Sequence, residues 1–166
     1  MIYVEHEGRQ LLVGAALMLV TATMQTFGVV GLEESVARVR ERVAQRATAA
    51  RMLAVLLGVI TSLFVLHLLE IFLWAGFYLH LGDMQSFSAI YESALGFTTM
   101  DSPDLPPAWV FLGAAEGITG VLMFAWSTGV MFNHMAWIIQ AREKYRRRHP
   151  WFAAKDQKIA REEPGA

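Results

Sequence analysis

The chain has 166 residues, of which 55% are hydrophobic, and its 14 Lys and Arg nearly balance its 15 Asp and Glu. That hydrophobic share is too high for an ordinary soluble domain of this size. The chain has no cysteine, which excludes disulfides and catalytic or metal-binding thiolates.

Three long runs of the chain are nearly free of charge. Residues 11–32 contain no Asp, Glu, Lys or Arg, and residues 52–82 and 105–141 contain one each, Glu70 and Glu116. About 20 helical residues, at roughly 1.5 Å each, cross about 30 Å of hydrocarbon. Each run therefore predicts a membrane span, since the amphipathic core helices of a soluble protein do not stay uncharged over such lengths.

The first predicted element is a transmembrane helix over residues 1–32. A cleaved signal peptide is the alternative, but Glu5 and Glu7 precede the apolar run, which is longer than a usual signal core. Residues 33–51 follow, with valines on one side and arginines around the other. We expect either a solvated connector or, preferably, an amphipathic helix on the cytoplasmic membrane surface, with its arginines facing lipid phosphates.

A second transmembrane helix is predicted at residues 52–82. It contains His67 and Glu70, which share one helical face because they are three positions apart. Ionisable groups inside a membrane face protein or water. The pair is either a hydrogen-bonded lock between helices or a proton- or metal-sensing pair. With one such motif in the chain, no metal site is firmly predicted.

A short helix is predicted at residues 83–98, where apolar residues recur at helical spacing. Asp83 or Ser86 is placed to cap its N-terminus. It is too short to span, so we expect a helix that enters from outside and points its negative end towards the membrane centre. Irregular backbone beyond it must face a pore or partner chains, which implies an oligomer.

A third transmembrane helix is predicted at residues 106–141, after a proline pair that suits a helix start. Gly117 and Gly120 permit close helix contact and also ease bending, so packing and a hinge both stay open. Glu116 is expected near the short helix, either accepting hydrogen bonds from it or lining a cavity. Residues 142–166 form a basic cytoplasmic tail.

The charges between the spans predict the orientation. Residues 33–51 carry five arginines and residues 142–148 carry five Lys and Arg, whereas the charged residues between the second and third spans are all acidic. Lys and Arg mark cytoplasmic loops. We expect a multi-pass plasma or inner membrane protein with its N-terminus outside and its C-terminus inside. Topology explains the basic segments, so nucleic acid is not an expected partner, whereas membrane lipids are.

Three segments resemble the pore domain of tetrameric potassium channels: HLLEIFLWA (67–75), YESALGFTT (91–99) and EGITGVLMFAWST (116–128). The resemblance covers residues 52–141 and is to small bacterial channels with two spans and a pore segment, here with one added span. It implies a pore domain with its outer helix at residues 52–82, its pore helix at 83–98 and its inner helix at 106–141. It also implies an all-α membrane protein, with three transmembrane helices and a re-entrant pore helix, that assembles as a homotetramer.

The filter-like loop, residues 99–104, departs from that family. The family's pore helix leads into Thr-Thr-Val-Gly-Tyr-Gly-Asp, and here Asp-Ser-Pro replaces Gly-Tyr-Gly. Glycine lets the filter backbone turn its carbonyls to the ion, and Pro103 has a fixed φ and no N–H. We therefore expect the innermost site to survive and the outer sites to be lost. By position, the ion pathway comprises Thr98, Thr99, Met100, Asp101, Ser102 and Asp104.

The resemblance and the altered loop together predict a tetrameric cation channel that is weakly selective among cations. Four Asp101 and four Asp104 carboxylates around the mouth would select for cations, passing K⁺ and Na⁺ and either passing Ca²⁺ or being blocked by it. A potassium-selective channel and a non-conducting scaffold or sensor are the alternatives. An enzyme or metal carrier built on the His and Glu residues of the spans ranks last, because the chain shows no nucleophile–base pair or nucleotide motif. No cofactor is expected.

Overall fold

The structure, a computed structural model, describes residues 2–45, 48–81, 84–100, 105–106 and 109–148. Within these ranges the fold is all-helical. Its helices are α1 (Ile2–Gln45), α2 (Ala49–His80), α3 (Ser86–Phe97) and α4 (Val110–Arg148). At the start of α3 the capping position is Gln85, whose side chain makes no capping hydrogen bond. The predicted cap at Ser86 is therefore not found, and Asp83 lies outside the described residues.

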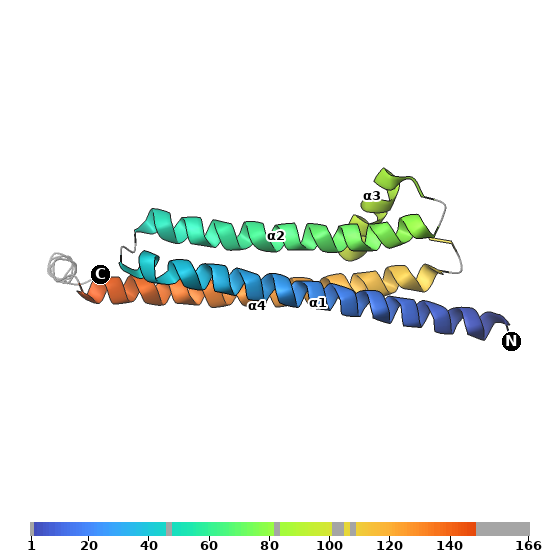
Figure 1. Cartoon of the computed structure of the whole chain (residues 1–166), viewed down its shortest axis with the longest axis horizontal. Coiled ribbons are helices and arrows are strands. Elements are labelled where there is room, and N and C mark those ends of the chain that lie inside the picture. Colours follow the sequence, from blue (N-terminus) through green and yellow to red (C-terminus); the bar gives the residue numbers. More distant parts are fainter. Residues whose placement is uncertain (1, 46–47, 82–83, 101–104, 107–108, 149–166) are drawn as a thin grey trace, which may run out of the picture.

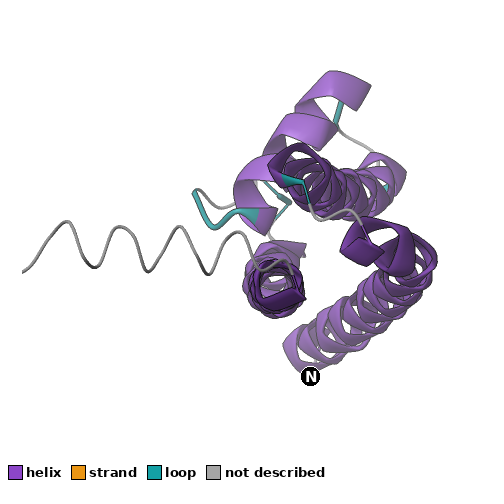
Figure 2. Ribbon diagram, turned by 90° about the vertical axis from the view of Figure 1, so that its left-hand side faces the viewer, coloured by secondary structure: helices purple, strands orange, loops and turns teal. Residues whose placement is uncertain are grey.

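The three long helices run side by side, and α3 packs at one end of them (Figure 1). Seen along the long axis, α3 lies to one side of the group (Figure 2). Both α1 and α3 pack against α2 and α4. The short helix is therefore held by the two helices that flank it in sequence.

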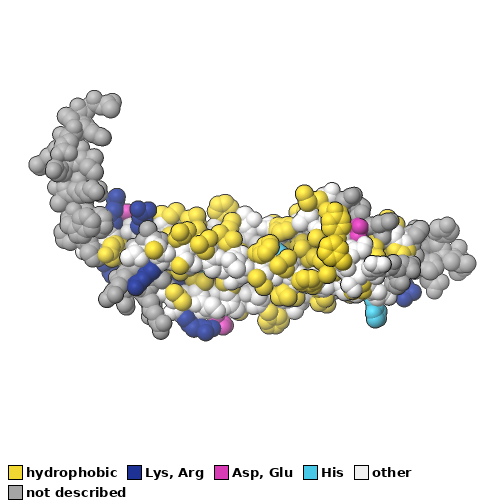
Figure 3. Space-filling model, turned by 90° about the horizontal axis from the view of Figure 1, so that it is seen from above, with side chains coloured by type: hydrophobic (Ala, Val, Ile, Leu, Met, Phe, Trp, Pro, Cys, Tyr) yellow, Lys and Arg dark blue, Asp and Glu magenta, His cyan; other side chains and the backbone are white. Residues whose placement is uncertain are grey.

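Three helices are long and apolar enough to cross a membrane, over Gly8–Arg40, Ala50–His80 and Val110–Arg148. This confirms the prediction of three candidate spans. Large apolar side chains point outwards, with Phe27 74%, Phe64 61% and Phe132 69% exposed. Figure 3 shows apolar side chains along the middle of the molecule and most Lys and Arg towards one end. This distribution fits a lipid environment around the middle.

The segment 33–51 differs from the prediction of a separate surface helix. α1 continues through it without a break to Gln45, and α2 begins at Ala49. The reason is that its apolar face has a partner within the protein. Val36 is buried in one cluster with Val59 of α2, so the helix extends alongside α2. No proline interrupts it.

Two apolar clusters hold the helices together. One joins α2, α3 and α4 around Trp74, Phe97 and Leu112, all with no measurable exposure. The other joins α1, α2 and α4 further along, around Val59 and Val130. The first cluster positions the short helix and the residues that follow it.

Candidate functional site

α3 ends in a tight turn against α4. The N–H of Met100 donates to the carbonyl of Leu95, and the N–H of Thr99 donates to the carbonyl of Gly96, both at 3.0 Å. This pair of bonds is the Schellman motif, which usually places glycine at the left-handed position. Here Thr99 occupies it, with φ of 58°. A β-branched residue in this conformation is unusual and strained, so the packing around it must hold it there.

The close approach of α3 to α4 depends on Gly120, whereas Gly117 lies at ordinary contact distance. A Cβ on Gly120 would lie 1.9 Å from the Phe97 carbonyl oxygen and 2.8 Å from its carbonyl carbon. A Cβ on Gly117 would lie 3.4 Å from both the Gly96 carbonyl oxygen and the Thr99 methyl group. Gly120 therefore lets the two backbones touch, which is a packing role. A hinge at Gly117 and Gly120 stays a prediction.

An open hollow of about 580 Å³ lies beside this junction. Thr98, Thr99 and Met100 are exposed next to it in the single chain. The hollow combines the C-terminal end of a helix, where the dipole is negative, with a wall of small and apolar side chains. Its lining is Gly96, Thr99, Gly113, Ala114, Gly117, Ile118, Val121 and Leu122.

Glu116 joins α2, α3 and α4 in a fully buried polar cluster. The Tyr78 hydroxyl of α2 donates to its Oε2. Ser93 Oγ of α3 lies 2.5 Å from its Oε1 and 2.9 Å from the Ile71 carbonyl oxygen. Of the two roles left open for Glu116, the structure favours hydrogen bonding to the short helix. Tyr78, which donates to Glu116 from α2, is only 1% exposed.

His67 belongs to a second polar chain that joins α1, α2 and α4. Its Nδ1 lies 2.8 Å from Glu70 Oε2, and its Nε2 lies 3.0 Å from Ser127 Oγ. Gln25 Nε2 donates to Ser127 Oγ at 2.9 Å. If the imidazole carries its proton at Nδ1, Gln25 donates to Ser127, Ser127 donates to Nε2 of His67, and Nδ1 donates to Glu70. This favours the hydrogen-bonded lock between helices over a metal-sensing pair.

A third polar contact links α1 to α4 nearer the basic end. His134 Nε2 lies 3.3 Å from Glu33 Oε1, and Arg40 Nη2 lies 3.5 Å from Glu33 Oε2. The Arg40 guanidinium also lies over the Trp137 ring, 5.2 Å from its centre. Sequence reasoning missed the pairing of His134 with Glu33, because this pairing depends on α1 continuing alongside α4.

The structure thus separates the predicted site residues into three groups. His67 and Glu70 lie in one buried network and Glu116 in another, while Thr98, Thr99 and Met100 lie at the exposed end of α3. Asp101, Ser102 and Asp104 lie outside the described residues. His80 is exposed, and within the described ranges no group of three or more His, Asp or Glu side chains is arranged to hold a metal ion.

Fold and site define a helical protein with three span-length helices and one short helix packed between the second and third of them. No family model, no curated protein and no solved structure matches this chain. Function must therefore be argued from the arrangement of these residues.

Proposed function

We propose that the chain is the subunit of a tetrameric cation channel whose altered filter is weakly selective among cations. One observation carries the proposal. The short helix α3 is anchored by a buried face to both neighbouring helices, and it ends beside a hollow on α4 with Thr98, Thr99 and Met100 uncovered.

The depth of this end supports a re-entrant helix. Gly117 and Gly120, which abut the end of α3, lie seven and ten residues beyond Val110. At 1.5 Å per residue this is about 10–15 Å along α4, or roughly one-third to one-half of the hydrocarbon thickness. Backbone that leaves a helix at such a depth must be covered by protein or must line water.

Further copies of the chain would supply that cover. Around a four-fold axis, four α3 helices would point their negative ends at the centre, where they favour a cation. The buried Glu116 cluster fixes each α3 from behind, through Ser93 and Tyr78. The Asp101 and Asp104 carboxylates would form rings at the mouth, and the missing filter glycines argue against steep selection for K⁺.

The experiment is a recording from the purified protein in planar bilayers under opposed K⁺, Na⁺ and Ca²⁺ gradients. We expect reversal potentials that shift little when Na⁺ replaces K⁺, together with Ca²⁺ current or block. Asp101→Asn should weaken the Ca²⁺ effect, whereas Asp83→Asn, a control in the same loop, should weaken it less.

Three results would count against the proposal. A reversal potential that follows K⁺ alone would establish the potassium-selective alternative. A protein that runs as a tetramer but passes no cation in liposomes would establish the non-conducting scaffold. A protein that stays monomeric when purified without denaturation would contradict the proposal altogether.

A further inference from the structure

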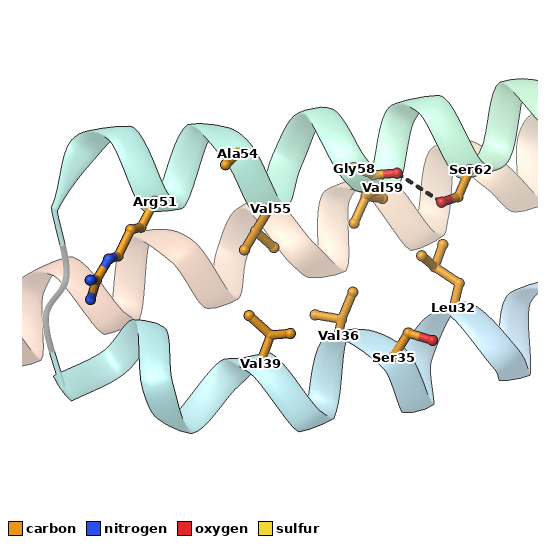
Figure 4. A pocket seen from close by; sticks show the side chains of 10 residues that line it. All are labelled: Leu32, Ser35, Val36, Val39, Arg51, Ala54, Val55, Gly58, Val59 and Ser62. Atoms are coloured by element: carbon orange, nitrogen blue, oxygen red, sulfur yellow. Dashed lines mark hydrogen bonds between the residues drawn. The ribbon is translucent and has the colours of Figure 1, made fainter.

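An open groove of about 610 Å³ lies along the junction between the second half of α1 and the first half of α2. Its volume lies within the range typical of ligand pockets. Figure 4 shows Val36 and Val39 of α1 and Val55 of α2 extending into the space between the two helices. The groove lies within the span-length parts of both helices, at the end where Lys and Arg gather (Figure 3).

The walls of the groove offer a ligand apolar contacts and no free hydroxyl. Ser35 Oγ donates to the Gly31 carbonyl at 2.7 Å, and Ser62 Oγ donates to the Gly58 carbonyl at 2.8 Å (Figure 4). Both serines therefore satisfy themselves within their own helices. An occupant of the groove needs a long apolar part rather than hydrogen-bonding groups.

One end of the groove carries a positive charge. Arg51 lines it there, and its side chain reaches towards α1 in Figure 4. Among the described residues, no carboxylate forms an ion pair with this guanidinium. A guanidinium placed at a membrane surface is well suited to bind a phosphate.

The length of the groove matches one leaflet. Between Arg51 and Ser62 α2 rises about 16 Å at 1.5 Å per residue, and half of the hydrocarbon core is about 15 Å thick. A molecule with an anionic head at Arg51 and an apolar tail along the valines would thus fit the leaflet nearer the basic end. By the charge rule for orientation, this is the cytoplasmic leaflet.

We propose that this groove binds an anionic phospholipid, with its phosphate on Arg51 and one acyl chain between α1 and α2. The site is independent of ion conduction, and it requires only that the three helices lie in a bilayer. A bound chain would fill the space between the helices and brace the continuation of α1 against α2.

The test is native mass spectrometry of the whole protein from detergent, incubated with equal concentrations of phosphatidylglycerol and phosphatidylcholine. We expect one phosphatidylglycerol per chain to be retained in preference to phosphatidylcholine. Arg51→Gln should lower that preference about fivefold, which corresponds to roughly 1 kcal/mol. Arg142→Gln, on the exposed surface of α4, should leave the preference unchanged.

A second pair of variants tests the acyl chain. Gly58 lines the groove, and a Cβ there would meet no atom within 4 Å. The backbone at position 58 therefore admits a side chain, and Gly58→Leu should fill the space and abolish lipid retention. Gly76→Leu is the matched control, because Gly76 is equally open and lies on the same helix outside the groove.

Three outcomes would overturn the proposal. Lipid retained by Gly58→Leu would place the lipid elsewhere. Equal loss of preference in the two arginine variants would indicate diffuse attraction to the basic end. If the wild-type protein retains no lipid and Gly58→Leu breaks its oligomer, a second copy of the chain covers the groove instead.

Discussion

The contact between Gly120 and Phe97 makes Gly120→Ala the most informative single substitution. The added Cβ would lie 1.9 Å from a backbone oxygen, whereas real Cβ atoms essentially never come closer than 3.0 Å to another heavy atom. The helices must therefore separate by more than about 1 Å, or α3 must detach. Unlike a side-chain tip, the Phe97 carbonyl group has no rotamer to which it can move.

The magnitude follows from two opposing effects. Overpacking of a tight contact costs roughly 1–3 kcal/mol, and a backbone clash belongs at the upper end, about 3 kcal/mol. Replacing glycine by alanine within a helix returns about 1 kcal/mol. We expect a net loss of about 2 kcal/mol. Gly129→Ala, on the same helix with no atom within 4 Å of the new Cβ, should gain up to about 1 kcal/mol.

Two assays can follow this effect. Unfolding in mixed micelles gives the free-energy difference between the two alanine variants, which we expect to be about 3 kcal/mol. The natural chain has no cysteine, so a cysteine at Ala89 reports on α3 alone. Ala89 is fully buried, and its thiol should react with a maleimide only when α3 detaches. Ser88→Cys, exposed on the same helix, is the accessible control.

The refuting result is clear. If Gly120→Ala and Gly129→Ala change the free energy of unfolding equally, and the thiol at position 89 stays protected in both, the backbones of α3 and α4 do not touch at Gly120. The depth assigned to the end of α3, and with it the main support for a re-entrant helix, would then be lost.

Two further substitutions test the residues around this contact. Tyr78→Phe removes a donor to the buried Glu116 and should lower the free energy of unfolding by about 1–2 kcal/mol. In a Glu116→Leu background the same substitution should change it by almost nothing. An equal loss in both backgrounds would disprove the hydrogen bond. Thr99→Gly relieves the left-handed strain at φ of 58° and should stabilise the protein by about 1 kcal/mol. Thr98→Gly, where φ is −87°, should instead destabilise the protein by about 1 kcal/mol. If Thr99→Gly proves less stable than Thr98→Gly in the same assay, Thr99 is not strained.

Sequence reasoning found the spans because the hydrophobic effect acts on local composition. Uncharged runs of 20 residues or more have few alternatives to crossing a membrane. The short helix between the second and third candidate spans could also be predicted, because its apolar residues recur at helical spacing. The same patterns marked His67, Glu70 and Glu116 as unusual, since a charge within a span is costly.

The hydrogen-bond partners of those residues could not be predicted from the sequence. Ser127 and Gln25 complete the His67 chain from two other helices, and they lie 60 and 102 positions from their partners along the sequence. Nothing in the local pattern distinguishes them from other polar residues of a span. The continuation of α1 through residues 33–45 was missed for the same reason. The amphipathic pattern of this segment fits a membrane surface as well as a neighbouring helix.

By itself, the sequence determined that this protein has three helices suited to a membrane and a short helix between two of them. Only the tertiary structure decided which buried polar groups meet and that Gly120 marks a backbone contact. It also showed that α1 continues beyond the predicted span and leaves a groove beside α2. The physical reason is that hydrophobicity and helix periodicity act over neighbouring residues, whereas hydrogen bonds and close packing between helices join residues that the chain keeps far apart.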